Sequence, residues 1–336
     1  MRDQRYTRRT FVFAVCVVLA LSASGCTGKG GQTPSGGGSS KPAQTKGPIT
    51  VGSKVDVEGP LLGEMIIAVL EDHGFKTVDK TRTGTTDVVR KALLAGEIDM
   101  YPEYTATAAT QFFKGVKYDP AILKDAQKVY DFVSEQDLKQ GVVWLGRAPA
   151  NNTWSVAIPR KLMLANNITT LTDWATYING GGAVQIVGSQ EFFNRSDAFP
   201  AFEKAYGFKL NANQMIALTT GDTAITEKAA AQGTNGANAA MAYGTDGSIG
   251  ALDLVLLKDP KGVQPIYQPA PTVRKQVADR YPELGRLLDP VFAKLDLATL
   301  QQLNGKISVN GEHPKTVARD WLESEGLLGM ADAVER

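Results

Sequence analysis

Cysteine and histidine are scarce in this sequence of 336 residues. Both cysteines, Cys16 and Cys26, lie near the N-terminus, and the two histidines, His73 and His313, are far apart. The folded part of the chain is therefore expected to hold no disulfide and no thiolate metal site. A lone histidine is usually a surface or satisfied residue, so we predict no metal centre and no bound cofactor.

An excess of charge of either sign is also missing. Lys and Arg number 36 and Asp and Glu 35, which leaves a formal net charge of +1. Proteins that bind nucleic acid usually carry a basic patch or stripe. This balance therefore gives no electrostatic reason to expect nucleic acid as a partner.

Recognisable catalytic motifs are absent as well. The sequence has no His-Glu-x-x-His, no Gly-x-Ser-x-Gly, no Gly-x-x-x-x-Gly-Lys and no dinucleotide-binding glycine pattern. Asp99, Glu103 and Asp246 could supply an acid/base pair, as in a glycosidase, but the sequence alone does not bring two of them face to face. We predict that the protein is not an enzyme, with an extracytoplasmic hydrolase as the alternative of another class.

The N-terminus has the pattern of an export signal. Four arginines in the first nine residues precede the apolar run 11–21, which has the length of a signal-peptide core. Small residues then lead to Cys26, which resembles a bacterial lipoprotein cleavage box although Ala23 stands where Leu is usual. We predict a signal peptide at 1–26 with lipid attached to Cys26. Cleavage without lipid is the alternative, and the basic start leaves the Sec and twin-arginine routes open.

Residues 27–48 are Gly, Ser, Thr, Pro, Gln and Lys with almost no apolar side chain. Such a segment cannot bury enough surface to fold, so we expect a flexible tether. An anchor followed by a tether would hold the folded domain at the extracytoplasmic face of the cell membrane.

Apolar runs typical of strands alternate with helical spacing through the rest of the chain, which predicts α/β architecture with a mostly parallel sheet in each of two lobes. We place lobe I at 49–151 and 262–330 and an inserted lobe II at 152–261, with a cleft between them. The expected strands include 49–54, 77–82, 142–145, 154–158, 184–187 and 215–218. The expected helices include 61–70, 87–94, 122–133, 161–165, 171–178, 198–206, 223–231, 291–303 and 316–328.

The stretch 95–107 places tyrosines and threonines where a short strand gives way to a helix. Ligands of open α/β sheets bind at the carboxyl ends of strands, so Tyr101 and Tyr104 are candidates to meet a ligand. The alternative is that both tyrosines are half-buried packing residues.

Four motifs together resemble the substrate-binding lipoproteins of osmoprotectant (glycine betaine/choline/carnitine) ABC importers. They are Gly52-Ser53-Lys54, the stretch Asp99 to Thr105, Tyr243-Gly244-Thr245-Asp246-Gly247, and the ending Ala318 to Leu322 with Gly326-Leu327-Leu328. The resemblance covers Ile49 to Leu328. It implies a type II, two-lobed periplasmic-binding-protein fold, an ABC permease as partner, and a box of aromatic rings that holds a quaternary ammonium group.

The resemblance also implies the residues of that box. The rings would be Tyr104, Tyr243, Tyr267 and Trp154, which stands where the family usually has Tyr, whereas Tyr101 would pack. A clamp for the ligand's carboxylate would comprise Lys54, Thr107 and Arg195, and the backbone carbonyl of Asn152 would close the box.

Elementary physics agrees with such a box. A trimethylammonium group has no N–H to donate, whereas ring faces offer a negative quadrupole at low desolvation cost. Lys54 and Arg195 together favour a ligand with a carboxylate, such as glycine betaine, over choline.

Some departures from the family leave other interpretations open. Trp154 and the extra aromatic surface of Phe192 and Phe193 allow a planar aromatic ligand stacked on Trp154 in the same transport role. Arg195 could instead lie on a helix surface. A structural or adhesive lipoprotein is a third class, and it would show no closure induced by a small molecule.

Overall fold

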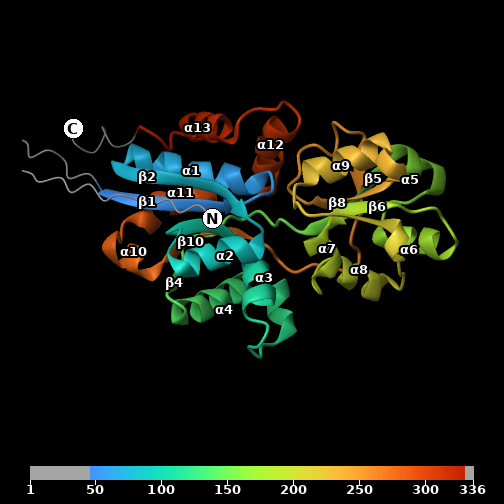
Figure 1. Cartoon of the computed structure of the whole chain (residues 1–336), viewed down its shortest axis with the longest axis horizontal. Helices are drawn as coiled ribbons and strands as arrows, with labels where there is room; N and C mark the ends of the chain where they lie inside the picture. Colours follow the sequence, from blue (N-terminus) through green and yellow to red (C-terminus); the bar gives the residue numbers. More distant parts are fainter. Residues whose placement is uncertain (1–45, 330–336) are drawn as a thin grey trace, which may run out of the picture. The chain divides into compact units, whose positions relative to one another are not determined.

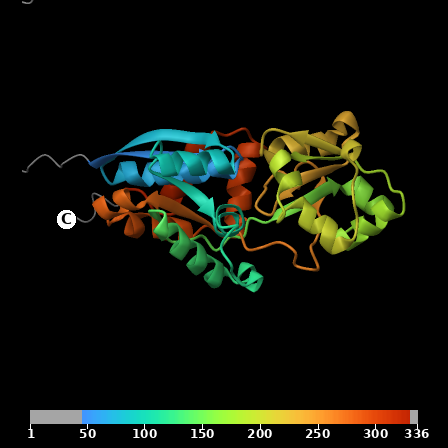
Figure 2. The same ribbon diagram turned by 60° about the horizontal axis from the view of Figure 1, so that its bottom comes forward.

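Two five-stranded sheets organise the part of the chain that the computed structural model describes, residues 46–329 (Figure 1). Each sheet carries helices on its faces, and the two groups of elements are separate in both ribbon views (Figure 2). The predicted two-lobed α/β fold is confirmed. The predicted signal peptide, Cys26 and the tether up to residue 45 lie outside the described residues.

Lobe I contains the sheet with strand order β2-β1-β3-β10-β4. Its strands are β1 (Lys46–Lys54), β2 (Phe75–Gly84), β3 (Met100–Tyr104), β4 (Val142–Trp144) and β10 (Pro269–Arg274). Its longer helices are α1 (Glu58–Asp72), α2 (Thr86–Ala95), α4 (Ala126–Lys139), α10 (Lys275–Arg280), α11 (Leu284–Ala293), α12 (Leu297–Ser308) and α13 (Pro314–Ser324). Short turns are α3 (Thr105–Thr107), η1 (Ala108–Phe112) and η2 (Pro120–Lys124).

The core of lobe I is built around α1, which is buried from Glu58 to Leu70. A helix that is apolar on nearly every side needs cover on every side. The sheet covers it on one side, and α11, α12 and α13 pack against the same cluster. Smaller clusters under α2 and α4 cover the opposite face of the sheet.

Lobe II contains the sheet with strand order β7-β6-β8-β5-β9. Its strands are β5 (Trp154–Pro159), β6 (Ile186–Ser189), β7 (Met215–Leu218), β8 (Ala239–Tyr243) and β9 (Leu254–Leu256). Its helices and short turns are α5 (Arg160–Asn166), α6 (Leu171–Asn179), α7 (Gln190–Asn194), α8 (Phe199–Tyr206), η3 (Ala212–Gln214), α9 (Thr223–Gln232) and η4 (Thr234–Gly236). An aromatic cluster fills the face under α6, α7 and α8, and small residues pack under α9.

The expectation of mostly parallel sheets is wrong, because both sheets are mixed. In lobe I, β1 pairs in parallel with β2 and β3, whereas β10 is antiparallel to β3 and β4. In lobe II, β6 pairs in parallel with β7 and β8, whereas β5 is antiparallel to β8 and β9. The strand β10 was not expected from the sequence, because it contains prolines at 269 and 271 and proline is uncommon inside a strand.

Two predicted boundaries also need correction. The tether does not extend to residue 48, because β1 begins at Lys46, which pairs with Phe75. The single helix expected at 291–303 is two helices, because the side chain of Asp296 accepts a hydrogen bond from the N–H of Thr299 and begins α12 anew.

The mixed topology brings particular chain ends together. The parallel strands β1 and β3 end at Lys54 and Tyr104, and the antiparallel strand β10 begins next to Tyr104. In lobe II, β8 ends at Tyr243, directly opposite Trp154 at the start of the antiparallel strand β5. Each sheet therefore presents the carboxyl ends of its parallel strands and the amino end of one antiparallel strand at the same edge.

Candidate ligand-binding site

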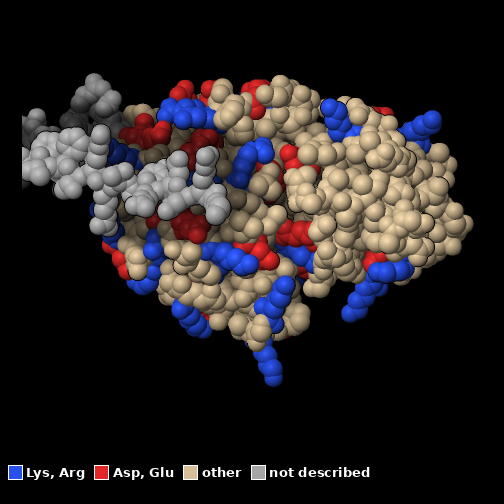
Figure 3. Space-filling model, viewed as in Figure 1, with Lys and Arg blue, Asp and Glu red and all other residues tan. Residues whose placement is uncertain are grey.

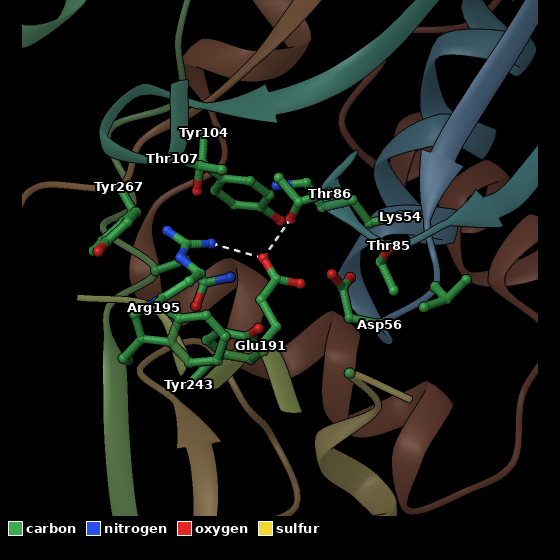
Figure 4. Close-up of a pocket in the computed structure, with 14 residues that line it drawn as sticks. Lys54, Asp56, Thr85, Thr86, Tyr104, Thr107, Glu191, Arg195, Tyr243 and Tyr267 are labelled. Carbon is green, nitrogen blue, oxygen red and sulfur yellow. Dashed lines mark hydrogen bonds and ion pairs between the residues drawn. The ribbon is translucent and has the colours of Figure 1, made fainter. Parts of the chain in front are cut away.

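One cavity of about 40 Å³ collects residues from these strand ends (Figure 4). All eight residues of the predicted site line it, namely Lys54, Tyr104, Thr107, Asn152, Trp154, Arg195, Tyr243 and Tyr267. Six further residues complete the lining, namely Val55, Asp56, Thr85, Thr86, Glu191 and Gly221. The predicted residues are thus brought together by the fold, and their role in holding a ligand stays a prediction.

Two of the rings form one wall of the cavity. Trp154 and Tyr243 lie opposite each other on β5 and β8, with ring centroids 4.6 Å apart and planes inclined by 37°. Behind them, Phe192 packs against Trp154 at 5.3 Å. Because Trp154 and Tyr243 are in direct contact, there is no slot for a flat ligand between them.

The expectation that Phe192 and Phe193 add aromatic surface to the cleft is wrong. Phe192 is fully buried in the core of lobe II, and Phe193 packs against the same cluster. Both phenylalanines belong to the short helix α7, which is capped by the hydroxyl of Ser189 and turns both rings inward.

Lys54 is held at the end of β1 by a buried partner. Its Nζ atom donates to Oε1 of Glu103 at 2.6 Å and lies 4.7 Å from the ring centroid of Tyr104. The other oxygen of Glu103 accepts a hydrogen bond from the hydroxyl of Tyr101 at 2.9 Å. Tyr101 is fully buried and does not line the cavity, as the resemblance implied.

Arg195 follows α7 and is buried, so it is not a helix-surface arginine. Its Nε and one terminal nitrogen donate to the two oxygens of Asp197 at 3.0 and 2.7 Å, and the other terminal nitrogen donates to Oε1 of Glu191 at 2.9 Å. Its guanidinium carbon lies 5.4 Å from the ring centroid of Trp154. Ring faces at this site therefore already interact with positive charge.

The remaining two tyrosines are oriented through their hydroxyl groups. The hydroxyl of Tyr104 donates to Oε1 of Glu58 at 2.7 Å, and that of Tyr267 donates to Oδ2 of Asp197 at 2.7 Å. Burial, with the nearby carboxylate, raises the pKa of both phenols well above the ordinary value, so both hydroxyls stay protonated.

Asn152 and Thr107 occupy buried positions on the cavity wall. The backbone N–H of Asn152 donates to the carbonyl of Tyr267 at 3.0 Å, and its side-chain amide donates to Oε1 of Glu58 at 3.2 Å. These bonds tie the segment before β5 to the segment before β10 and to the start of α1. The role predicted for the carbonyl of Asn152 stays a prediction.

Two carboxylates at the cavity were missed by the sequence analysis. Asp56 lies two residues after Lys54 and accepts a hydrogen bond from the N–H of Gly59 at 2.6 Å. Burial raises the pKa of Asp56 to about 6, although this hydrogen bond and Lys54 lower it. Glu191 lies one helical turn before Arg195, and this i, i+4 spacing of opposite charges is the signal that could have revealed it.

Thr86 connects the second helix to the other lobe. Thr85 is the N-cap residue, and Thr86 is the first residue of α2, one residue before the start expected from the sequence. Its hydroxyl donates to Oε1 of Glu191 at 2.7 Å and so joins the two lobes (Figure 4).

A larger cleft of about 520 Å³ adjoins the cavity. The two spaces share Thr85, Thr86, Glu191, Arg195 and Gly221, and the outer lining adds polar side chains such as Gln111, Lys114 and Asn194. A solute from outside would reach the aromatic rings past Glu191 and Arg195.

The described residues show neither a metal cluster nor a membrane span. Within 46–329, no three His, Cys, Asp or Glu side chains gather in a way that could hold a metal ion. In the same range, no helix has both the length and the apolar character needed to cross a bilayer. On the face drawn in Figure 3, charges of both signs are interspersed, in keeping with the balanced composition.

Two lobes that share a cavity lined by ring faces and buried cations define a solute-binding protein. The family model described as "Substrate binding domain of ABC-type glycine betaine transport system" matches residues 47–324. The chain belongs to this family of extracytoplasmic substrate-binding transport proteins, which confirms the resemblance inferred from the motifs.

Individual relatives support the same placement. The "Glycine betaine-binding protein YehZ" of Escherichia coli (strain K12) is 52% identical over 85% of this chain and 93% of that protein. The solved structure of apo YehZ has a TM-score of 0.62 and covers 83% of this chain and 99% of that chain. The "Ergothioneine transport permease/ergothioneine binding protein EgtU" of Helicobacter pylori (strain G27) is 31% identical over 83% of this chain but only 48% of that protein.

A more distant structure bears on the fold alone. Lactococcal OpuAC, solved in a closed conformation complexed with glycine betaine, is 16% identical to this chain with a TM-score of 0.55. The match covers 83% of this chain and 96% of that one, and it agrees with the type II periplasmic-binding-protein fold.

Proposed function

We propose that this protein captures a quaternary-ammonium solute, with glycine betaine as the first candidate, and delivers it to the permease of an ABC importer. The observation that carries the proposal is the convergence of Tyr104, Trp154, Tyr243 and Tyr267 on one cavity with Lys54 and Arg195. Ring faces would surround the ammonium group, and the N–H groups of Lys54 that are not engaged with Glu103 would meet a carboxylate where the ligand carries one.

The expected affinity follows from the number of such contacts. Each ring face contributes on the order of 0.5–2 kcal/mol to binding a cation, and each charged donor adds roughly 1.5–3 kcal/mol. Ordering and desolvation take back much of this sum, so we expect a net of about 8 kcal/mol, a Kd near the micromolar range.

The first prediction tests the aromatic box by calorimetric titration with glycine betaine and choline. Trp154→Leu is expected to weaken binding at least about tenfold, because it removes the indole face. The matched control is Trp174→Leu, since Trp174 is fully buried in the same lobe but does not line the cavity. Both variants should melt at lower temperature, and only Trp154→Leu should lose affinity. Equal affinity in the two variants would remove the box from the mechanism.

Catalysis is the alternative of another class. Asp56 and Glu191 line the cavity with pKa values displaced in opposite directions, as general acid/base pairs often are. Membership of a substrate-binding transport family favours binding without bond chemistry. Recovery of glycine betaine unchanged after prolonged incubation would agree with this, and any turnover would contradict it.

The cellular placement is part of the same proposal. Export by the signal at 1–26 and lipid attachment at Cys26 would tether the domain at the outer face of the membrane beside its permease. Mass spectrometry of the mature N-terminus, with Cys26→Ser as control, distinguishes lipidation from simple cleavage.

A further inference from the structure

Glu191 occupies the boundary between the inner cavity and the outer cleft. Its Oε1 atom accepts hydrogen bonds from the hydroxyl of Thr86 and from Arg195, at 2.7 and 2.9 Å. No protein donor within residues 46–329 is hydrogen-bonded to the other oxygen, Oε2. Figure 4 shows the carboxylate of Glu191 between Arg195 and Asp56, with dashed lines from one of its oxygens to Arg195 and Thr86.

The charges around the cavity do not favour a ligand that carries a carboxylate. Two cations, Lys54 and Arg195, line it, and each already has a buried carboxylate partner behind it, Glu103 at 2.6 Å and Asp197 at 2.7 Å. Asp56 and Glu191 add two further carboxylates to the lining itself. The set therefore counts two cations against four carboxylates, and a ligand with a carboxylate adds a fifth.

Glu191 is held in its charged form. Burial raises the pKa of this carboxyl, but Arg195, Lys54 and the hydroxyl of Thr86 outweigh burial and bring the pKa below its ordinary value. At neutral pH the group that meets an incoming ligand is an anion with one oxygen available.

We propose that Glu191 is a specificity-determining residue: its carboxylate takes the place beside Arg195 that a ligand carboxylate would need, and so biases the box toward quaternary-ammonium solutes that carry no carboxylate. The proposal rests on the proposed function and ranks ligands within its class. An amide or hydroxyl end can donate its N–H or O–H to Oε2, whereas a carboxylate at the same place meets a like charge.

The test combines one substitution in the protein with one chemical change in the ligand, and compares the four affinities. Glycine betaine is compared with its amide, in which the carboxylate is replaced by a neutral group of nearly the same size, and the wild type with Glu191→Gln. In the wild type, the amide should bind about tenfold more tightly than glycine betaine, because it lacks the repelling charge. In Glu191→Gln, the preference should vanish or reverse, because the like charge is gone and the terminal nitrogen of Arg195 that bonds to Glu191 loses its carboxylate partner.

Glu203→Gln is the matched control. Glu203 is a buried glutamate of lobe II paired with Lys209 at 2.5 Å, and it does not line the cavity. This variant should keep the wild-type ratio between the two ligands. A Glu191→Gln ratio within about twofold of the wild-type ratio would overturn the proposal, because it would show no coupling between the charges.

The outcomes separate this inference from the proposed function. If the wild type binds neither glycine betaine, nor its amide, nor choline, the proposed function fails. If the wild type binds glycine betaine as tightly as the amide or more tightly, only the inference fails. This second comparison needs no variant, so it decides the matter even where Glu191→Gln does not fold.

Discussion

At the residue scale, the cavity is governed by how each charge is compensated. Lys54 and Arg195 supply positive charge close to ring faces, and each is held in place by a hydrogen-bonded carboxylate. Fixed cations with bonded partners lose little freedom when a ligand arrives, which reduces the cost of binding. Asp56 differs from these groups, because its pKa of about 6 lets pH decide its charge.

Asp56 is therefore expected to make ligand binding depend on pH. An ionised carboxylate at the cavity attracts a quaternary ammonium group, so affinity for choline should rise several-fold from pH 5 to pH 7.5, with a midpoint near 6. Asp56→Asn should remove this rise, because the amide can still accept from Gly59 but does not titrate. Titration calorimetry at several pH values measures the affinity for choline in both proteins. If the variant keeps the pH profile of the wild type, Asp56 is not the group that causes the rise.

Asp56 should also affect the stability of the free protein, in the opposite direction. Its folded-state pKa lies above its unfolded value, so its contribution to stability is present below about pH 4 and is lost as the pH rises through about 6. Glu64, whose pKa is raised to about 7, also makes stability depend on pH, but it does not line the cavity and is present in both proteins. The difference in unfolding free energy between the wild type and Asp56→Asn at each pH therefore reports the contribution of Asp56.

At the element scale, the start of α1 links the site to the rest of lobe I. Glu58 accepts hydrogen bonds from Tyr104, Asn152 and Asn304, which belong to β3, the segment before β5, and α12. Asn304 also donates to the backbone carbonyl of Thr245 at 3.0 Å. The buried amide of Asn304 on α12 thus joins α1 to the loop that follows β8. Tyr243, whose ring lines the cavity, is the last residue of β8.

Removal of this amide is expected to be costly. Asn304→Leu leaves a buried carboxylate oxygen and a buried carbonyl without their donor, so the free energy of unfolding should fall by about 2–4 kcal/mol. Asn310→Leu, at an exposed position after α12, is the control and should change stability by less than about 0.5 kcal/mol. Urea denaturation of both variants decides the matter, and equal midpoints would show that the amide has no structural role.

At the scale of the whole described part, hydrogen bonds across the cleft hold the two lobes together. Asp197 of lobe II accepts from Thr110 at 2.8 Å and from Gln111 at 3.2 Å, and both donors belong to η1 of lobe I. Thr86 and Glu191 form another such bond. Opening the cleft would break these bonds, so they favour the closed arrangement independently of any ligand.

Thr110→Val is therefore expected to weaken all ligands alike. Loss of one bond that exists only when the cleft is closed should lower the affinities for choline and glycine betaine by the same factor, about fivefold. Thr176→Val is the control, since Thr176 is exposed and its hydroxyl donates to the carbonyl of Thr172 within α6. A loss confined to one ligand would place Thr110 in ligand contact instead.

The sequence by itself determined the alternation of helices and strands, because apolar periodicity is a local property. It also determined which residue types meet at the cavity, since the motifs around Lys54, Tyr104 and Tyr243 are short and ordered along the chain. The tertiary structure decided the direction of β5 and β10, because pairing direction depends on partners far away in the sequence. It alone decided that Lys54 is paired with Glu103 and that Thr86 reaches Glu191 across 105 residues, because compensation of buried charge depends on distances in the folded molecule.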